Sequence, residues 1–131
     1  MELKPIGIVV SRYRERADAP RQGRESEVTS RITIFEDYQE GLDGLENYSN
    51  IIVLYWADRA DRNILRVVPP GQTQERGVFA TRSPSRPNPI AMCMVDLLEI
   101  KGKIITVRGL DALDGSPVLD IKPFSSEIDS I

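Results

Sequence analysis

Short runs of alternating hydrophobic and polar residues dominate the chain and predict β-strands. The clearest run is 28–35, where Val28, Ile32 and Ile34 share one parity and polar residues fill most of the other. This period of two is typical of a strand with one face toward the core and one toward water. Residues 50–56 are apolar on both parities, which indicates a strand covered on both faces. The same pattern predicts further strands at 5–11, 64–68, 77–81, 90–100, 103–108 and 117–121.

One helix is predicted, at 36–45. Phe35, Tyr38 and Leu42 recur there at helical spacing, and two nearby glycines are expected to keep the helix short. About seven short strands and one short helix within 131 residues predict a single domain, 1–131, that is mainly β. Among mainly β architectures, the pattern favours an antiparallel barrel or a sandwich.

The run at 90–100 is hydrophobic on both faces. One face is expected to fill the core, and the other needs a cover, which either the predicted helix or a second subunit would supply. The pattern leaves these two alternatives open. Lys101 and Gly102 separate this run from 103–108 and predict a β-hairpin.

Two features of the composition exclude whole classes of chemistry. The chain has no histidine and one cysteine, Cys93. It therefore lacks the imidazole of Ser-His-Asp and Cys-His catalysis and any internal disulfide, and we expect no metal site. A single cysteine among apolar neighbours is typical of a buried, unreactive thiol in a cytoplasmic protein. The N-terminus has no signal-peptide pattern, and the longest apolar run, 51–57, is far shorter than the roughly 20 residues of a membrane helix, so we expect no membrane association.

Charge is distributed unevenly, although the net charge is only −3. Arginines outnumber lysines 13 to 4 and gather in two segments: six lie in 12–31 against four acids, and six in 58–86 against three. Residues 36–46 hold five acids and no base. A guanidinium group matches phosphate and carboxylate with two parallel hydrogen bonds. The arginines therefore indicate either an anionic ligand such as nucleic acid or an arginine-rich solvated surface, and charge alone does not decide between them.

Polar groups and a stiff backbone occur together in three segments: 20–22, 77–90 and 109–123. The middle segment carries Arg82, Arg86 and Asn88 among prolines, and ordered polar groups bind with little loss of entropy. The last segment offers Asp111 and Asp114 beside a Gly-Ser turn. Arginines facing carboxylates suit a zwitterionic ligand. The G-x-G-x-x-G fingerprint is absent, so any nucleotide-like cofactor would bind outside the familiar βαβ folds.

A resemblance to a known family rests on segments that occur in the same order: 4–7, 20–22, 42–45, 77–84, 86–90 and 113–123. They resemble motifs of the TsaA-like family, also called TrmO, over nearly the whole chain. The resemblance implies a mainly antiparallel β-barrel that forms a homodimer, in a minimal form without an extra C-terminal domain. It also implies a methyl transfer from S-adenosylmethionine to N6 of threonylcarbamoyladenosine at tRNA position 37.

The resemblance also implies roles for particular residues. The cofactor pocket would be lined by Pro20, Arg21, Gln22, Asp58, Arg59, Arg82, Met92, Leu113, Asp114, Gly115 and Ser116. The tRNA would be contacted by Arg24, Arg62, Arg66, Arg86 and Asn88. The acceptor nitrogen is a poor nucleophile until its proton leaves, so a general base is expected. Without histidine, the candidates are Asp58, Asp111 and Asp114 or the substrate's own carboxylate, and the choice stays open.

Two positions depart from the family pattern. Members usually carry Phe-His before the residue equivalent to Arg59, where this chain has Ala57 and Asp58. They usually place glycine after Ile90, where this chain has Ala91. These departures keep two alternatives open: a noncatalytic barrel that binds a nucleotide or RNA, and a methyltransferase that acts on a small molecule.

Overall fold

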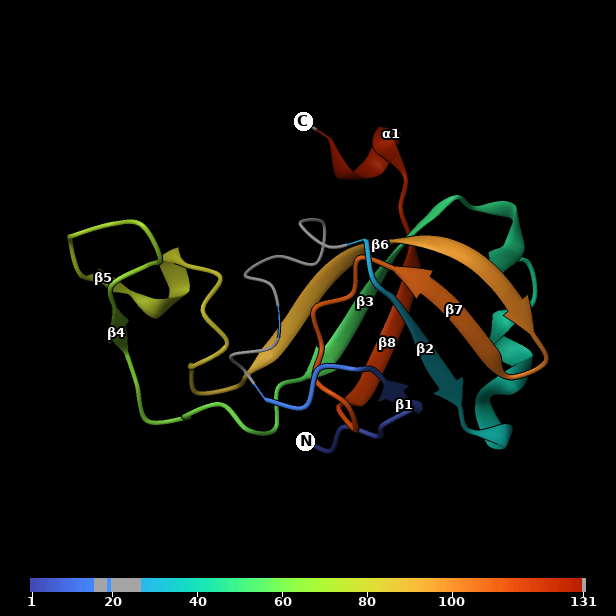
Figure 1. Cartoon of the computed structure of the whole chain (residues 1–131), viewed down its shortest axis with the longest axis horizontal. Helices are drawn as coiled ribbons and strands as arrows, with labels where there is room; N and C mark the ends of the chain where they lie inside the picture. Colours follow the sequence, from blue (N-terminus) through green and yellow to red (C-terminus); the bar gives the residue numbers. More distant parts are fainter. Residues whose placement is uncertain (16–18, 20–26, 131) are drawn as a thin grey trace.

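Six antiparallel strands close into a barrel in this computed structural model, which describes residues 1–15, 19 and 27–130 (Figure 1). The strand order is β1-β2-β7-β6-β3-β8. The bounds are β1 Gly7–Val10, β2 Thr29–Ile34, β3 Asn50–Trp56, β6 Ile90–Lys101, β7 Ile104–Arg108 and β8 Pro117–Pro123. The predicted class, an antiparallel β-barrel, is confirmed. Instead of about seven strands in one sheet, six form the barrel, and a separate ribbon pairs β4 (Arg66–Val67) with β5 (Arg76–Gly77).

The barrel interior is filled by the inward parity of each strand. In β2 the alternation predicted from the sequence is confirmed, with Ile32 and Ile34 buried. The side chains with no exposed surface are mostly β-branched, and they include Val9, Ile32, Ile51, Val53, Val95, Ile105, Val107 and Val118. Such side chains pack well on a pleated surface. β3 differs from the prediction on its outward face, where side chains are half-buried rather than fully covered.

The predicted helix at 36–45 is present as 3₁₀ turns. They are η3 (Glu36–Leu42) and η4 (Leu45–Asn47), separated by Gly44 in a left-handed conformation with φ of 89°. Two glycines within four residues disfavour the longer α-helical ladder. Residues 77–81 also differ from the predicted strand, because β5 ends at Gly77 and a 3₁₀ turn, η5 (Val78–Ala80), follows.

A short α-helix, α1 (Ser126–Asp129), follows the last strand. It has four residues, and no helix in the described part of the chain is long and apolar enough to cross a bilayer.

The long connections all leave the same end of the barrel, which we call the mouth. There the last pairs of neighbouring strands meet, Trp56 with Ile90 and Ile8 with Pro117. The mouth is formed by the described parts of three connections: 11–28, 57–89 and 109–116. The opposite end carries η3, η4 and the predicted hairpin turn, where Gly102 has φ of 62°. Two of the three segments singled out from the sequence, 77–90 and 109–123, thus reach the mouth end of the barrel. The third, 20–22, lies outside the described residues.

The middle connection extends away from the barrel. Figure 1 shows this segment, residues 60–88, as a projection that contains β4, β5 and η5, and we call it the arm. Its root is fixed to the barrel, because the Ala57 N–H donates to the carbonyl oxygen of Pro89 at 2.9 Å.

Candidate functional site

Arg59 connects the three segments of the mouth. It follows β3 directly, and its Nη1 donates to the carbonyl oxygen of Arg14 at 2.7 Å. Its Nη2 donates to the carbonyl oxygen of Asp114, and its Nε lies 3.8 Å from the carboxylate of Asp58. One guanidinium group therefore holds the 11–15 segment against the turn between β7 and β8. This arrangement gives Arg59 a positioning role that its motif match did not reveal.

Asp114 holds the same turn from the other side. Its Oδ1 accepts the N–H of Ser11 at 3.0 Å, and its own N–H donates to the carbonyl oxygen of Tyr13 at 2.7 Å. Its Oδ2 lies 3.9 Å from Nη1 of Arg14. Gly115 continues the turn with φ of 86°, a backbone conformation that favours glycine. A carboxylate that accepts a backbone N–H at a chain crossing stabilises the crossing itself.

Asp111 lies in a different environment. The hydroxyl group of Tyr55, on β3, donates to its Oδ1 at 2.8 Å. Burial raises the pKa of Asp111 above its usual value, and hydrogen bonds with Tyr55 and Cys93 partly oppose this rise. Cys93 is buried, as predicted, and its thiol also lies 3.3 Å from the carbonyl oxygen of Gly109. The mouth therefore contains one carboxyl group that keeps its proton to higher pH than an exposed aspartate does.

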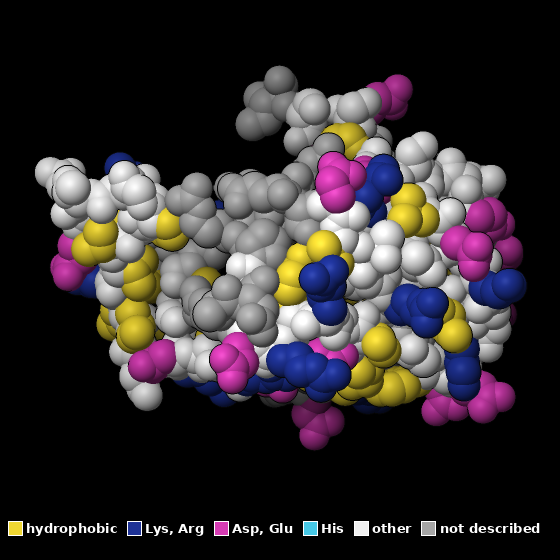
Figure 2. Space-filling view, in the orientation of Figure 1, with side chains coloured by type: hydrophobic (Ala, Val, Ile, Leu, Met, Phe, Trp, Pro, Cys, Tyr) yellow, Lys and Arg dark blue, Asp and Glu magenta, His cyan; other side chains and the backbone are white. Residues whose placement is uncertain are grey.

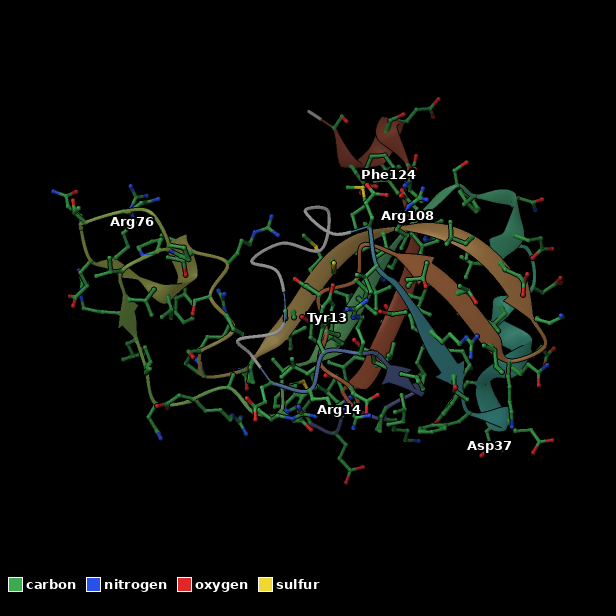
Figure 3. The ribbon with its side chains drawn as sticks, viewed as in Figure 1. Tyr13, Arg14, Asp37, Arg76, Arg108 and Phe124 are labelled. Atoms are coloured by element: carbon green, nitrogen blue, oxygen red, sulfur yellow. The ribbon has the colours of Figure 1, made fainter. Side chains whose placement is uncertain are left out.

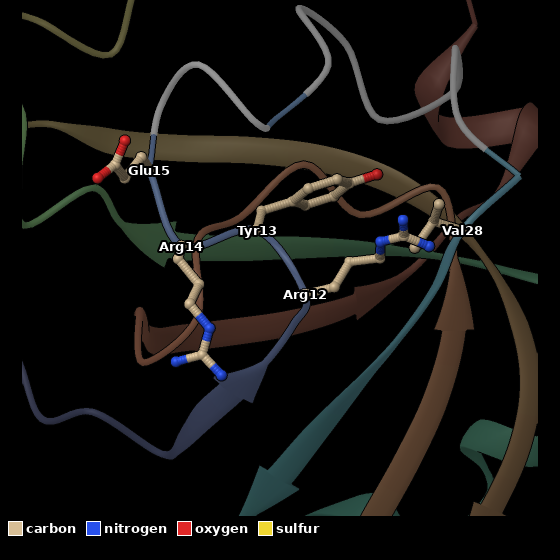
Figure 4. A pocket seen from close by; sticks show the side chains of 5 residues that line it. All are labelled: Arg12, Tyr13, Arg14, Glu15 and Val28. Atoms are coloured by element: carbon tan, nitrogen blue, oxygen red, sulfur yellow. The ribbon is translucent and has the colours of Figure 1, made fainter.

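A hollow of about 470 Å³ lies beside the mouth and is shown in Figure 4. It is lined by Arg12, Tyr13, Arg14, Glu15 and Val28. The side chains of Arg12 and Arg14 extend from the segment that follows β1. The Tyr13 side chain, which lies between them in the sequence, is only 6% exposed. Arg12 and Arg14 were not assigned a role from the sequence. Their position directly after a strand that ends at the mouth is the signal that would have identified them.

The arm uses most of its predicted RNA-contacting residues to fix its own shape. Nε of Arg62 donates to the carbonyl oxygen of Pro87 at 2.7 Å, and its Nη2 donates to Oδ1 of Asn88 at 3.3 Å. The guanidinium carbon of Arg62 also lies 5.1 Å from the centre of the Trp56 ring. Nη1 of Arg86 donates to two carbonyl groups of the same loop.

Arg66, also predicted to contact tRNA, forms an ion pair with Glu75 across the ribbon. The predicted RNA contacts of the arm remain predictions. The contacts of Arg62, Arg86 and Arg66 described above all lie within the chain and fix the shape of the arm.

Two predicted cofactor-binding residues lie apart from the mouth contacts. Arg82 belongs to the arm, and Met92 lies on the outer face of β6, paired with Leu54 and 50% exposed. In the described ranges, no hydrogen bond or ion pair joins either of them to Asp114. Figure 3 shows the same separation for Arg76, which lies at the far end of the arm from Tyr13.

Contacts within one chain therefore join only part of the predicted site. Asp58, Arg59 and 113–116 meet at the mouth, whereas Arg82 and Met92 do not join them. Four predicted site residues lie outside the described part of the chain: Pro20, Arg21, Gln22 and Arg24. Among the residues that the structure does describe, no group of three or more acidic or cysteine side chains is arranged to hold a metal ion.

The closed barrel with polar connections at one end defines a β-barrel protein outside the doubly wound nucleotide-binding folds. The family model described as "tRNA-methyltransferase O N-terminal domain" matches residues 8–130. The chain is 60% identical over 131 residues to a protein of Archaeoglobus fulgidus named "S-adenosyl-L-methionine-binding protein", with 100% of this chain and 94% of the relative covered. This chain belongs to the TrmO family.

Two longer proteins share the same domain. The crystal structure of TrmO from Pseudomonas aeruginosa superposes with a TM-score of 0.83 at 30% identity, covering 100% of this chain and 59% of that one. A mouse protein named "tRNA (adenine(37)-N6)-methyltransferase" is 33% identical over 135 residues, covering 97% of this chain and 31% of the mouse protein. The chain thus spans less than two thirds of either protein.

Proposed function

We propose that this chain binds S-adenosylmethionine and transfers its methyl group to N6 of threonylcarbamoyladenosine at tRNA position 37. Family membership and the names of the relatives support the cofactor and the tRNA substrate. The observation that carries the proposal is the mouth, where Arg59 joins two backbone segments and where the half-buried carboxyl group of Asp111 lies in one of the connections. We also propose that the protein acts in the cytoplasm and that its working form is a homodimer.

The residues of the mouth fit the cofactor. S-adenosylmethionine carries a carboxylate, an ammonium, a sulfonium and an adenosine, so its pocket needs cationic, anionic and apolar groups. Arg12 and Arg14 line the hollow and match the carboxylate, whereas the carboxyl group of Asp114 matches the cationic part. When bound, the cofactor supplies a methyl group on a sulfonium, an excellent electrophile. The protein's own task is then to position the acceptor nitrogen and remove its proton.

Among the three candidate bases, we propose Asp111. Oδ1 of Asp114 already accepts a backbone N–H, and Asp58 is an exposed group beside the Arg59 guanidinium. Asp111 is half-buried, and its raised pKa makes it a better proton acceptor than an ordinary aspartate. In the proposed step, a carboxylate oxygen of Asp111 accepts the proton of the acceptor nitrogen, and the Tyr55 hydroxyl keeps the carboxyl group in place.

The test uses purified protein, methyl-labelled S-adenosylmethionine and tRNA that carries threonylcarbamoyladenosine, followed by mass spectrometry of the nucleosides. We expect a labelled methyl group on N6 of that nucleoside. Methylation of small molecules without tRNA would replace the proposal with a small-molecule methyltransferase. Cofactor binding without transfer to any tRNA would replace it with a noncatalytic binding barrel.

The role of Asp111 is tested with Asp111→Asn and the matched control Asp120→Asn. Asp120 lies on β8 and pairs with Lys122 at 3.0 Å, away from the contacts of the mouth. Loss of a general base lowers turnover about 10²- to 10⁴-fold, and we expect this for Asp111→Asn with cofactor affinity retained. Asp120→Asn should turn over at the wild-type rate. Wild-type turnover of Asp111→Asn would assign the base to another group.

A further inference from the structure

The inner faces of β3 and β6 change in character toward the mouth. Deeper in the barrel, the opposed pair Ile51 and Val95 fills the core with aliphatic side chains that have no exposed surface. Nearer the mouth, the inward positions include Tyr55 on β3 and Cys93 on β6, which are 8% and 6% exposed. A polar group that is buried in this way needs a hydrogen-bond partner. Both side chains therefore require polar partners at this end of the barrel core.

The register of the two strands brings these side chains to one place. Cys93 lies opposite Val53, and Tyr55 lies opposite Ala91. Tyr55 and Cys93 are therefore diagonal neighbours on the inner face of two paired strands. Diagonal neighbours in a sheet lie within reach of an aromatic side chain. A single third group can thus contact both.

The carboxyl group of Asp111 is that third group. The Tyr55 hydroxyl donates to its Oδ1 at 2.8 Å, and the Cys93 thiol forms a second hydrogen bond with the same side chain. The Sγ atom of Cys93 also lies 3.3 Å from the carbonyl oxygen of Gly109, two residues before Asp111. Acidic side chains stand out on the surface in Figure 2, whereas Asp111 is half-buried. The strand pair thus holds both the carboxyl group and the backbone that leads to it.

The other two candidate bases are held differently. The Asp58 side chain is 42% exposed beside Arg59, and the carboxylate of Asp114 accepts the backbone N–H of Ser11. In the described part of the chain, Asp111 is the only candidate base whose carboxyl group is hydrogen-bonded to side chains of barrel strands. Groups held by strands keep their position more precisely than groups held by loops. The barrel therefore supports Asp111 in the way that a reacting group requires.

We propose that Tyr55 and Cys93 are positioning residues of the methyl transfer, which fix the carboxyl group of Asp111 beneath the mouth and favour its charged form. This inference deepens the proposed function and rests on it. A donor to a carboxylate stabilises the charged form, which is the form that takes the proton from the acceptor nitrogen. No ion pair in the described part of the chain includes Asp111, and its own backbone supplies its remaining hydrogen bond. The thiol acts as a hydrogen-bonding group and not as a nucleophile, which agrees with its burial.

The pH profile of methyl transfer tests this role. Tyr55→Phe and Cys93→Ala each remove one donor to the carboxylate and should raise the pKa of Asp111. The acid limb of kcat/KM, where turnover falls as the base becomes protonated, should therefore move to higher pH in both variants. Cys93→Ser restores a donor and should return the limb toward its wild-type position. A side chain that only fills space would change the rate equally at every pH.

Two controls match these substitutions. Tyr48→Phe makes the same chemical change at a 43% exposed tyrosine at the opposite end of the barrel. Val95→Ala removes an inward-facing aliphatic side chain of β6, two positions from Cys93, and lowers stability without removing a hydrogen-bonding side chain. Both controls should keep the wild-type acid limb. Circular dichroism confirms that each variant is folded at the pH values used.

A second measurement does not depend on methyl transfer. Carbon-13 NMR of protein labelled at the aspartate carboxyl carbons follows the titration of Asp111, whose signal is identified by its loss in Asp111→Asn. The midpoint should lie at higher pH in Tyr55→Phe and in Cys93→Ala than in the wild type, and Cys93→Ser should shift it less than Cys93→Ala. Unchanged midpoints in both variants would overturn the inference.

The outcomes separate the inference from the proposed function. If the wild type methylates tRNA and both variants keep its acid limb, the inference is wrong while the proposed function stands. A rate that falls equally at every pH, with an unchanged titration of Asp111, would show that Tyr55 and Cys93 only pack. If the wild type methylates no tRNA, the proposed function fails, and the titration alone decides whether the two residues hold the carboxyl group.

Discussion

Replacing Arg59 with alanine should loosen the mouth without damaging the barrel. The guanidinium group makes two hydrogen bonds, to the carbonyl oxygens of Arg14 and Asp114, that no other described side chain duplicates. A hydrogen bond from a charged donor contributes about 1.5–3 kcal/mol when shielded, and exposed ion pairs contribute about 0.2–1 kcal/mol. Because the side chain is 46% exposed, we place each bond between these limits.

At about 1 kcal/mol for each bond, Arg59→Ala should lower the free energy of unfolding by about 2 kcal/mol. For a chain of this length, 1 kcal/mol corresponds to about 4 °C, so the melting temperature should fall by about 8 °C. The affinity for S-adenosylmethionine should fall at least about tenfold, because binding must then also reorder the two segments that Arg59 joins. A tenfold fall corresponds to about 1.4 kcal/mol of binding free energy. Calorimetry measures both quantities, first without and then with the cofactor.

The matched control is Arg66→Ala. Arg66 is a more exposed arginine whose ion pair with Glu75 lies within the arm. Its removal should change the melting temperature by less than about 2 °C, because exposed pairs contribute little. If Arg59→Ala and Arg66→Ala behave alike in stability and in cofactor affinity, the contacts of Arg59 do not hold the mouth together and our reasoning about the site is wrong.

Three further predictions concern the barrel and its connections. Gly7→Ala places a Cβ 2.5 Å from the carbonyl oxygen of Thr33 and should cost about 1–3 kcal/mol in urea unfolding. Gly41→Ala, whose Cβ meets nothing within 4 Å, should not destabilise the fold. Because burial raises the pKa of Asp111, the folded state binds its proton more tightly, and the contribution of Asp111 to stability falls as pH rises from about 3.8 through the folded pKa. Asp111→Asn should therefore gain stability relative to wild type between pH 4 and pH 7 in urea titrations, and the opposite slope would contradict the burial argument. Arg86→Ala removes the donor to two loop carbonyls and should speed proteolysis within the arm while leaving the global melting temperature nearly unchanged.

Local patterns predicted the strands well because period-two alternation is a local property. The predictions for 28–35 and 90–100 match β2 and β6, and Gly102 forms the expected turn. The helical spacing at 36–45 was also correct in position, but the glycines there favour 3₁₀ turns, which periodicity alone does not distinguish from an α-helix.

The order of the strands was not predictable from the same patterns. β1 pairs with β8, and β2 pairs with β7, across more than seventy residues of sequence. Alternation shows which face of a strand is buried but does not identify its neighbour. That all three polar connections share one end follows only once the pairing is known.

The candidate site was predicted in part. Asp58, Arg59 and the turn at 113–116 do meet, as their motifs indicated. The role of Arg59 was not predictable, because its partners are backbone carbonyl groups 45 and 55 positions away, and a backbone acceptor leaves no signature in side-chain identity. The loop contacts of Arg62 and Arg86 were not predictable for the same reason, and their RNA contacts remain predictions, since an arginine that holds its own loop has the same sequence pattern as one that binds a phosphate.

Closure of the barrel has a consequence for how the protein moves. β3 has hydrogen-bonded neighbours along both sides, β6 and β8, and offers no edge at which fraying begins. Its amide protons should exchange with deuterium only when the whole barrel opens, whereas those of the ribbon β4–β5 should exchange through local opening. The connections that carry the polar groups of the mouth are thus attached to a rigid barrel. A bound ligand should slow the exchange of amide protons in these connections and leave the exchange of the strand amides unchanged.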